Sequence, residues 1–234
     1  MNAFFNCFRP VSHKRSCVKV FIALFICCLL SFFLSACKKE TDYFSYVSEL
    51  RSNLLLAEND GLALRIYAVK KENPYLADGI PRDSSPRVEL YLSAPAGDKD
   101  CTVSFSVDKQ TLGGDMSFDS VKAEYYYSCT ADLSDAEELL CTVTYGENSY
   151  ELTAKTVRNN DTLSPKEVLK KLLSAETQLF TDMTDKYGFT GEIYLRLLYE
   201  DAPYYYIGII DRNGNTTAFL LSAKTGKVLA KRQT

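Results

Sequence analysis

Short segments in which apolar and polar residues alternate are the feature that most constrains the fold of this chain. Between residues 43 and 157 the alternation has a period of two and is interrupted by turn-forming residues. In the segment 101–107, for example, Cys101, Val103 and Phe105 share one face of a strand. Roughly seven or eight such segments predict an antiparallel β-sandwich, of the immunoglobulin or fibronectin type in a loose sense.

The pair Asp60 and Gly61 gives the clearest hairpin signal, because Asp-Gly between two alternating runs favours a two-residue turn. The run before this turn also fits a helix, since Val47, Leu50 and Leu54 recur at helical spacing. We expect a strand there, because the turn requires one.

The C-terminal part has a different pattern, which begins after a polar linker at residues 158–163. Ser164 fits a helix N-cap, and Glu167 completes a capping box around a proline at the first helical position. The helix is expected to run to about Met183, and three or four strands follow it. One helix and an antiparallel meander predict a small α+β domain over residues 164–234, after a sandwich over residues 43–157.

The first 36 residues differ from the rest in charge and hydropathy. They contain four basic residues, no acidic residue, and an apolar run over residues 20–34. This run is shorter than the roughly 20 residues that span a bilayer. The run ends in the tetrapeptide Leu34-Ser35-Ala36-Cys37, which resembles the lipobox of bacterial lipoproteins. The resemblance implies a signal peptide over residues 1–36, cleavage before Cys37, and a palmitate-type lipid modification of Cys37.

The alternative is an uncleaved N-terminal anchor in which Cys37 has no special role. Both interpretations place residues 38–234 outside the cytoplasm. A lipidated chain is expected on the extracytoplasmic face of the cell membrane, or on the outer membrane of a cell that has two. Residues 37–42 would then be the lipidated cysteine and its tether, of which residues 38–42 reach at most about 18 Å.

Cleavage would also change the chemistry of the chain. It would remove the four basic residues, so the formal net charge would fall from -3 to -7. An acidic chain is not expected to bind nucleic acid through a basic face. The only histidine, His13, lies in the same segment. Its loss excludes Ser-His-Asp and Cys-His catalysis and histidine-bound metals, so we expect neither a cofactor nor a metal.

Three cysteines follow Cys37 in the sequence, at Cys101, Cys129 and Cys141. All three fall on the apolar face of their predicted strands. A cross-strand disulfide between Cys129 and Cys141 is one interpretation, because Asp135 lies midway between them in a predicted loop. Three reduced and buried thiols are the other interpretation.

Two tyrosine triplets, at residues 125–127 and 204–206, place aromatic rings on both faces of their strands. Tyr126 and Tyr205 are the members that we expect to be exposed. An exposed tyrosine ring is rigid and amphipathic, so it can stack on a sugar or line a peptide groove. The alternative is structural, since tyrosine favours strands and packs across them.

The end of the chain shows a second resemblance, carried by Asp211, Asn213-Gly214 and the segment LLSAKTGKVL at residues 220–229. It is similar to the last hairpin of PepSY-type modules, which commonly ends in D-A-x-T-G-x-V; Ser222 stands where that pattern has Asp. The resemblance implies a role in extracytoplasmic inhibition or regulation of peptidases, without catalytic residues.

These observations together predict a membrane-anchored, non-enzymatic binding or regulatory module that acts on an envelope protein or peptide. The alternative is an envelope hydrolase that uses carboxylates or a lysine. That alternative requires a pocket with two or more convergent acids, or a lysine with a strongly shifted pKa.

Overall fold

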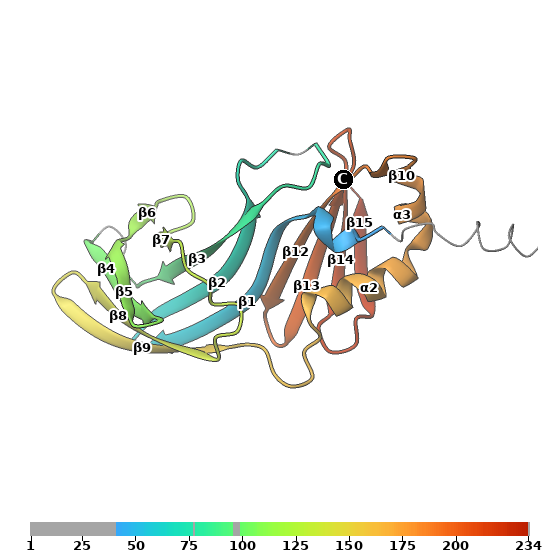
Figure 1. Cartoon of the computed structure of the whole chain (residues 1–234). Helices are drawn as coiled ribbons and strands as arrows, with labels where there is room; N and C mark the ends of the chain where they lie inside the picture. The colour runs from blue at the N-terminus through green and yellow to red at the C-terminus, as the bar shows by residue number, and fades with distance from the viewer. Residues whose placement is uncertain (1–40, 77, 96–98, 234) are drawn as a thin grey trace, which may run out of the picture. The chain divides into compact units, whose positions relative to one another are not determined.

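The computed structural model describes residues 41–76, 78–95 and 99–233 (Figure 1). The expected signal peptide, His13 and the expected lipidation site Cys37 lie outside the described residues. The described part is mainly antiparallel β-structure with little helix. Its elements, in chain order, are η1 (Tyr43–Tyr46), β1 (Val47–Asn59), β2 (Leu62–Glu72), β3 (Ser84–Ser93), β4 (Cys101–Val107), β5 (Gln110–Asp115), β6 (Ser117–Asp119), β7 (Glu124–Cys129), β8 (Glu138–Tyr145), β9 (Asn148–Thr156), α2 (Pro165–Ala175), α3 (Thr177–Asp182), β10 (Thr184–Asp185), β11 (Gly188–Phe189), β12 (Glu192–Tyr199), β13 (Pro203–Ile210), β14 (Thr216–Ser222) and β15 (Val228–Gln233).

The first predicted hairpin is confirmed. β1 and β2 pair antiparallel from Asn59 and Leu62 outward, and Asp60 and Gly61 form the two-residue connection. Both connecting residues have positive φ, 50° at Asp60 and 79° at Gly61, as a type I′ turn requires. The run that also fits a helix is therefore a strand, because its hydrophobic residues pair with β2.

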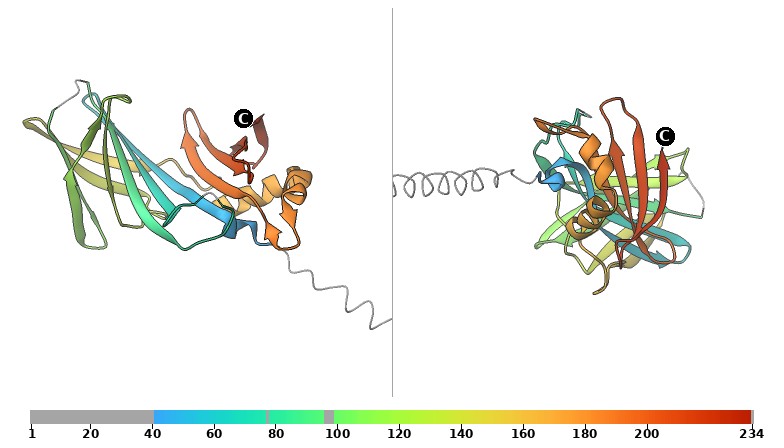
Figure 2. Two further views of the ribbon diagram at one scale, coloured as in Figure 1. Left: turned by 90° about the horizontal axis from the view of Figure 1, so that it is seen from above. Right: turned by 90° about the vertical axis from the view of Figure 1, so that its right-hand side faces the viewer.

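Two layers of strands enclose the first hydrophobic core. β1, β2, β3, β7 and β6 form one layer, and β9, β8, β4 and β5 form the other (Figure 2). β1 also pairs with β9 at Leu55 and Leu56, which joins the layers and makes the sandwich nearly closed. The alternation predicted for β4 is confirmed, since Cys101, Val103 and Phe105 are buried in this core.

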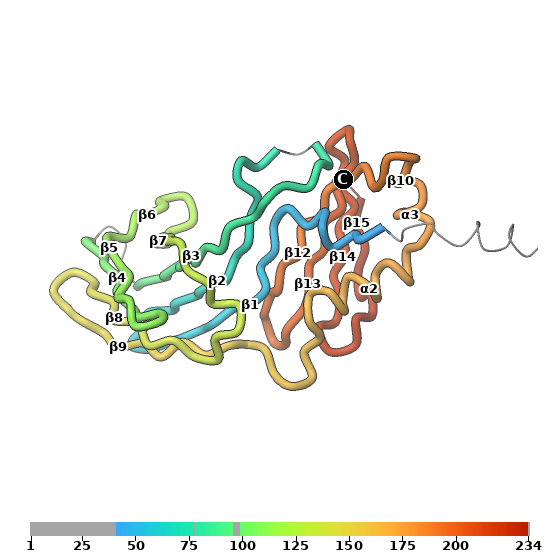
Figure 3. The backbone as a smooth tube through the Cα atoms, viewed as in Figure 1, coloured from blue at the N-terminus to red at the C-terminus, as the bar shows by residue number. Residues whose placement is uncertain are grey.

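The C-terminal strands extend the same sheet. β1 pairs in parallel with β12 between Val47 and Arg51, and β12, β13, β14 and β15 continue as an antiparallel meander. The result is one sheet of 13 strands, in which β1 is hydrogen-bonded to β2 on one edge and to β12 and then β9 on the other. The linker predicted at residues 158–163 lies in the irregular segment between β9 and α2 (Figure 3).

The predicted helix begins as expected but is interrupted. Ser164 caps α2, and both hydrogen bonds of the capping box with Glu167 are present. Glu176 leaves the helical region at φ -120° and ψ 37°, so α2 and the shorter α3 replace one helix. At the break the Thr177 hydroxyl donates to the Leu173 carbonyl oxygen at 3.0 Å. The two helices cover one face of β12, β13 and β14 with a second core that includes Leu172 and Ile207.

The capping box predicts a measurable loss of stability. We expect Ser164→Ala to lower the free energy of unfolding by about 1 kcal/mol, because the first turn of α2 loses an acceptor for its backbone N–H groups. Ser164→Thr keeps the acceptor and is expected to lie close to wild type. Urea unfolding followed by circular dichroism measures both, and equal stability of the alanine variant and wild type would contradict the role of the cap.

Candidate functional site

The two tyrosines predicted to be exposed have opposite environments. Tyr126 on β7 is half-buried and borders a pocket. Tyr205 on β13 is 0% exposed, so the prediction for it is wrong. The reason is that α2 and α3 cover the face of β13 that carries Tyr205, whose hydroxyl donates to the Leu163 carbonyl oxygen at 2.8 Å. Burial raises the pKa of Tyr205 to about 12.

A row of aromatic and guanidinium groups crosses the opposite, outward face of the sheet. The rings of Tyr126 and Tyr91 lie 5.1 Å apart between centroids, and those of Tyr91 and Tyr67 lie 5.8 Å apart. The Arg51 guanidinium lies 4.7 Å from the centre of the Tyr67 ring. We call this row, with the residues that continue it on β12 and β13, the tyrosine–arginine stripe; its members are Tyr126, Tyr91, Tyr67, Arg51, Arg196, Tyr194 and Tyr206.

The stripe continues across the parallel pairing of β1 with β12. Arg51 and Arg196 are direct neighbours in this pairing. The Arg196 guanidinium lies 5.1 Å from the centre of the Tyr194 ring and 5.8 Å from that of Tyr206. Each arginine therefore rests on an aromatic face, an arrangement that stabilises a cation and restricts its rotation.

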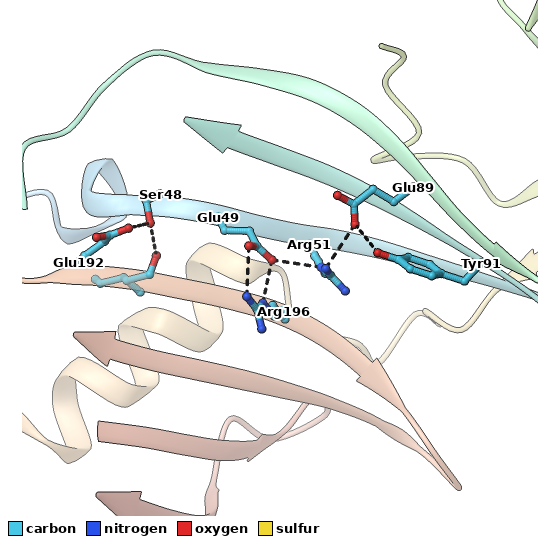
Figure 4. Close-up of polar contacts among 8 residues, drawn as sticks. Ser48, Glu49, Arg51, Glu89, Tyr91, Glu192 and Arg196 are labelled. Carbon is cyan, nitrogen blue, oxygen red and sulfur yellow. Dashed lines mark hydrogen bonds and ion pairs between the residues drawn. The ribbon is translucent and has the colours of Figure 1, made fainter. Parts of the chain in front are cut away.

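Two largely buried carboxylates hold these arginines in place (Figure 4). Glu49, whose side chain is 8% exposed, accepts from Nε of Arg51 at 3.2 Å and from Nε and Nη2 of Arg196 at 2.8 and 3.1 Å. Glu89, whose side chain is 12% exposed, accepts from Arg51 Nη2 at 3.3 Å and from the Tyr91 hydroxyl at 3.2 Å. Both carboxylates are ion-paired with arginine.

Tyr91 is the point at which this network meets the aromatic rings. Burial, and to a lesser extent the Glu89 carboxylate, raises the pKa of Tyr91 to about 12. Tyr91 therefore stays protonated over the whole physiological range of pH, and its hydroxyl donates a hydrogen bond to Glu89. The network offers fixed donors and aromatic faces, and it is suited to binding.

A pocket of about 300 Å³ lies at the β7 end of the stripe. The Glu124 carboxylate on its wall accepts from Arg65 and from the Ser93 hydroxyl. The backbone N–H of Lys122 holds the pKa of Asp119 below its usual range. The volume is at the lower end of ligand pockets and matches a single side chain or small ring. The lining residues are Tyr91, Ser117, Phe118, Asp119, Lys122, Glu124 and Tyr126.

A wider groove of about 970 Å³ opens between η1, β1 and the chain that leads into β3. Phe44, Val47 and Leu50 give it an apolar wall, and Lys70 and Arg82 line it with positive charge. The volume is in the range of ligand sites, although the lining is open and of mixed polarity.

A second buried polar cluster lies where β2 ends and β12 begins. Glu72 is 6% exposed and Glu192 is 4% exposed, and both line a cavity of about 10 Å³. The Ser48 hydroxyl donates to Glu192 Oε1 (Figure 4). The Arg82 backbone N–H donates to Glu72 Oε1 at 2.9 Å. Glu192 Oε2 is buried without a hydrogen-bond partner among the described residues. Burial is the largest cause that raises the pKa of both carboxyls.

The three described cysteines are free thiols. The pairing that would place Cys129 opposite Cys141 is absent, because β7 pairs with β3 and β6 whereas β8 pairs with β4 and β9. The chain between the two cysteines crosses from one layer of the sandwich to the other. It does not form the hairpin loop centred on Asp135 that the sequence predicted. Burial raises the pKa of Cys101 to about 11 and that of Cys141 to about 12, so both thiols stay protonated and unreactive.

Sequence reasoning found Tyr126 but missed the rest of the stripe. Arg65 and Tyr67 alternate with the buried residues Leu64, Ile66 and Ala68 of β2, so the alternation does place them outward. Tyr67 contacts Arg51 on β1 and Tyr91 on β3, and Arg65 pairs with Glu124 on β7; these pairings are not readable from the sequence. No sequence pattern indicated that Glu72 and Glu192 would be buried together, because both residues lie at strand ends, where acidic side chains are usually solvated.

A scan against protein-family models and searches of curated proteins and of solved structures find no match to this chain. Within residues 41–76, 78–95 and 99–233, no helix has the length and apolar character needed to cross a membrane.

The two ion pairs of Glu49 are expected to contribute to the free energy of unfolding. We expect Glu49→Gln to lower the free energy of unfolding by about 2 kcal/mol, because two half-buried guanidinium groups lose their shared carboxylate. Glu58→Gln is the matched control, since Glu58 lies on the same strand and is exposed. Urea unfolding of both variants measures the difference; a loss as small as that of the control would contradict this role of Glu49.

Proposed function

We propose that this chain is a bacterial cell-envelope lipoprotein whose extracytoplasmic part, residues 38–234, is a non-enzymatic binding or regulatory module. The lipobox-like segment that ends at Cys37 supports the membrane anchor. The partner is an envelope protein or peptide, which the module reaches close to the membrane surface because the tether is short.

The tyrosine–arginine stripe is the observation that carries the binding role. Tyrosine and arginine are the side chains most enriched at the energetic centres of protein interfaces. Here Glu49 holds both arginines and Glu89 holds Arg51 and Tyr91, so little side-chain entropy is lost when a partner binds. The pocket beside Tyr126 provides room for one anchoring side chain of that partner.

We further propose that residues 43–157 are an immunoglobulin- or fibronectin-like sandwich and that residues 164–234 are a PepSY-like α+β domain. The two layers around the first core support the sandwich. Helices α2 and α3 on one face of the β12–β15 meander support the α+β assignment, as does the similarity of the last hairpin. A PepSY-like module would favour regulation of a peptidase.

The second candidate is the carboxylate-dependent envelope hydrolase. The Glu72–Glu192 pair is the observation in its favour, because it brings two acids with raised pKa together. Their cavity of about 10 Å³ has room for about one water molecule and none for a substrate. The binding role therefore has the stronger support.

The anchor is tested by labelling cells with an alkyne analogue of palmitate. We expect the wild-type chain to incorporate the label and Cys37→Ser to lose it completely, because Cys37 carries the only thiol that the lipobox presents. Cys28→Ser is the matched control within the apolar run and is expected to label normally. An intact N-terminus at Met1 with unmodified Cys37, found by mass spectrometry, would refute the lipoprotein assignment.

The binding role is tested by replacing Tyr126 with a photoreactive phenylalanine analogue in intact cells. We expect a discrete crosslinked product at position 126 and none at Tyr187, which is 83% exposed but lies outside the stripe. With the identified partner, Tyr126→Ala is expected to weaken binding about tenfold, or about 1.4 kcal/mol, and Tyr187→Ala less than twofold.

Two results would count against this proposal. One is equal crosslinking at the two positions, which would mean that the stripe is not the contact surface. The other is hydrolysis of a peptide or glycan panel by the purified chain without any crosslinked partner, which would favour the hydrolase instead.

A further inference from the structure

The segment 78–83 lies against the residues that precede β12. Gly79 approaches them so closely that a Cβ at this position would lie 2.9 Å from the Thr190 carbonyl oxygen and 3.3 Å from that of Gly191. Gly79 also has a φ of 69°, which favours glycine. Figure 3 shows the connection between β2 and β3 extending beyond both strands toward the C-terminal part of the sheet. The segment is therefore seated on β12 by backbone contacts that leave no room for a side chain.

Two hydrogen bonds tie this segment to the end of β2, one of them a 3.4 Å bond from the Asn73 backbone N–H to the Asp83 carbonyl oxygen. The backbone N–H of Arg82 donates to Glu72 Oε1 at 2.9 Å. The Arg82 side chain is engaged within the segment itself, because its guanidinium pairs with Asp78 at 2.5 Å. Release of the segment from Glu72 would keep this ion pair intact, so the segment can move as one piece.

The buried carboxyls beneath the segment lack the partners that two ionised groups require. Glu72 and Glu192 line the same small cavity, and Glu192 Oε2 has no hydrogen-bond partner within the described part of the chain. An ionised carboxylate accepts hydrogen bonds only, whereas a protonated carboxyl can also donate one. A single proton on one carboxyl would remove one of the two buried charges and leave a carboxyl that can donate a hydrogen bond as well as accept one.

We propose that Glu72 and Glu192 form a proton-dependent latch that holds segment 78–83 against the start of β12. With one carboxyl protonated, only one buried charge remains and the segment stays docked. With both ionised, two like charges face one cavity, and release of the segment hydrates them.

The direction of the pH effect follows from the raised pKa of both carboxyls in the docked state. Docking then binds protons, so its stabilisation is present at low pH and is lost as the pH rises through the raised pKa. Arg82 and Lys71 face Glu192 and partly offset the effect, whereas Asp78 strengthens it. The Ser48 hydroxyl on β1 and the side chain of Tyr46 on η1 complete the surroundings.

Release of the segment would also change the wide groove. Pro81, Arg82 and Asp83 form one wall of this groove of about 970 Å³. The latch therefore gives the module a groove that is closed on one side in acid and widens toward alkaline pH. This inference is independent of the proposed partner and of the lipid anchor.

Hydrogen exchange at the Arg82 amide tests the latch. We expect its protection in the full chain, purified in detergent, to fall by up to about tenfold per pH unit once the pH exceeds the raised pKa of the pair. The amides of β13 serve as the internal reference for intrinsic exchange rates and global stability. Glu192→Gln keeps the size and the acceptor for Ser48 but removes the charge, so its Arg82 amide is expected to stay protected at every pH.

Asp83→Asn is the matched control, because it removes an exposed carboxyl of the same segment and should retain the wild-type pH dependence. If the β13 reference shows that Glu192→Gln is unfolded, Glu72→Gln decides in its place, since it keeps an acceptor for the Arg82 N–H. The same pH dependence in wild type and in the folded Gln variant would overturn the latch. Protection at high pH that requires calcium and disappears with a chelator would overturn it as well, because a metal ion would then hold the pair.

Discussion

The parallel pairing of β1 with β12 is the constraint on which the rest of the structure depends. β1 is the one strand among those described that is hydrogen-bonded to three others. Its first half lies between β2 and β12, and its second half lies between β2 and β9. The change of partner occurs at the bulge between Arg51 and Asn53, where the Asn53 side chain donates to the carbonyl oxygens of Leu133 and Ala136. The same short stretch thus joins both hydrophobic cores and closes the first of them.

This pairing also positions both polar clusters. Glu49 and Arg51 on β1 lie beside Tyr194 and Arg196 on β12, which lets one carboxylate serve two arginines. Ser48, the residue before Glu49, faces Glu192 instead. Two adjacent residues of β1 therefore contact different polar clusters. Glu49 holds the arginines of the stripe, and Ser48 contacts the acid pair beside segment 78–83. A partner on the stripe and a proton on the acid pair would both act on β1.

Local features of the fold were predictable from the sequence. The Asp60-Gly61 hairpin, the buried face of β4 and the capping box at Ser164 each depend on residues close together in the chain, and all three are confirmed. The features that failed depend on distant segments. Tyr205 is buried because helices from an earlier part of the chain cover its face, and Cys129 and Cys141 lie apart because β7 and β8 belong to different layers.

The candidate site was less predictable than the fold for the same reason. Alternation in β2 directs Arg65 and Tyr67 outward, but no local pattern shows that Arg51 and Arg196 become neighbours. The contact of Arg196 with Glu49 joins positions 147 residues apart. Tyr126 could be named because it lies in a tyrosine triplet, whereas the other residues of the stripe are distributed over five other strands, β1, β2, β3, β12 and β13.

The distance along the chain between β1 and β12 has a consequence for biogenesis. A chain that emerges from its N-terminus forms β1 early, and β2 can pair with it at once, but β12 arrives only after most of the chain has appeared. Until then one edge of β1 lacks its final partner over Val47–Arg51, and an unpaired edge is a template for pairing with another chain. A high contact order of this kind slows folding and gives chaperones that bind extended segments a period in which to act.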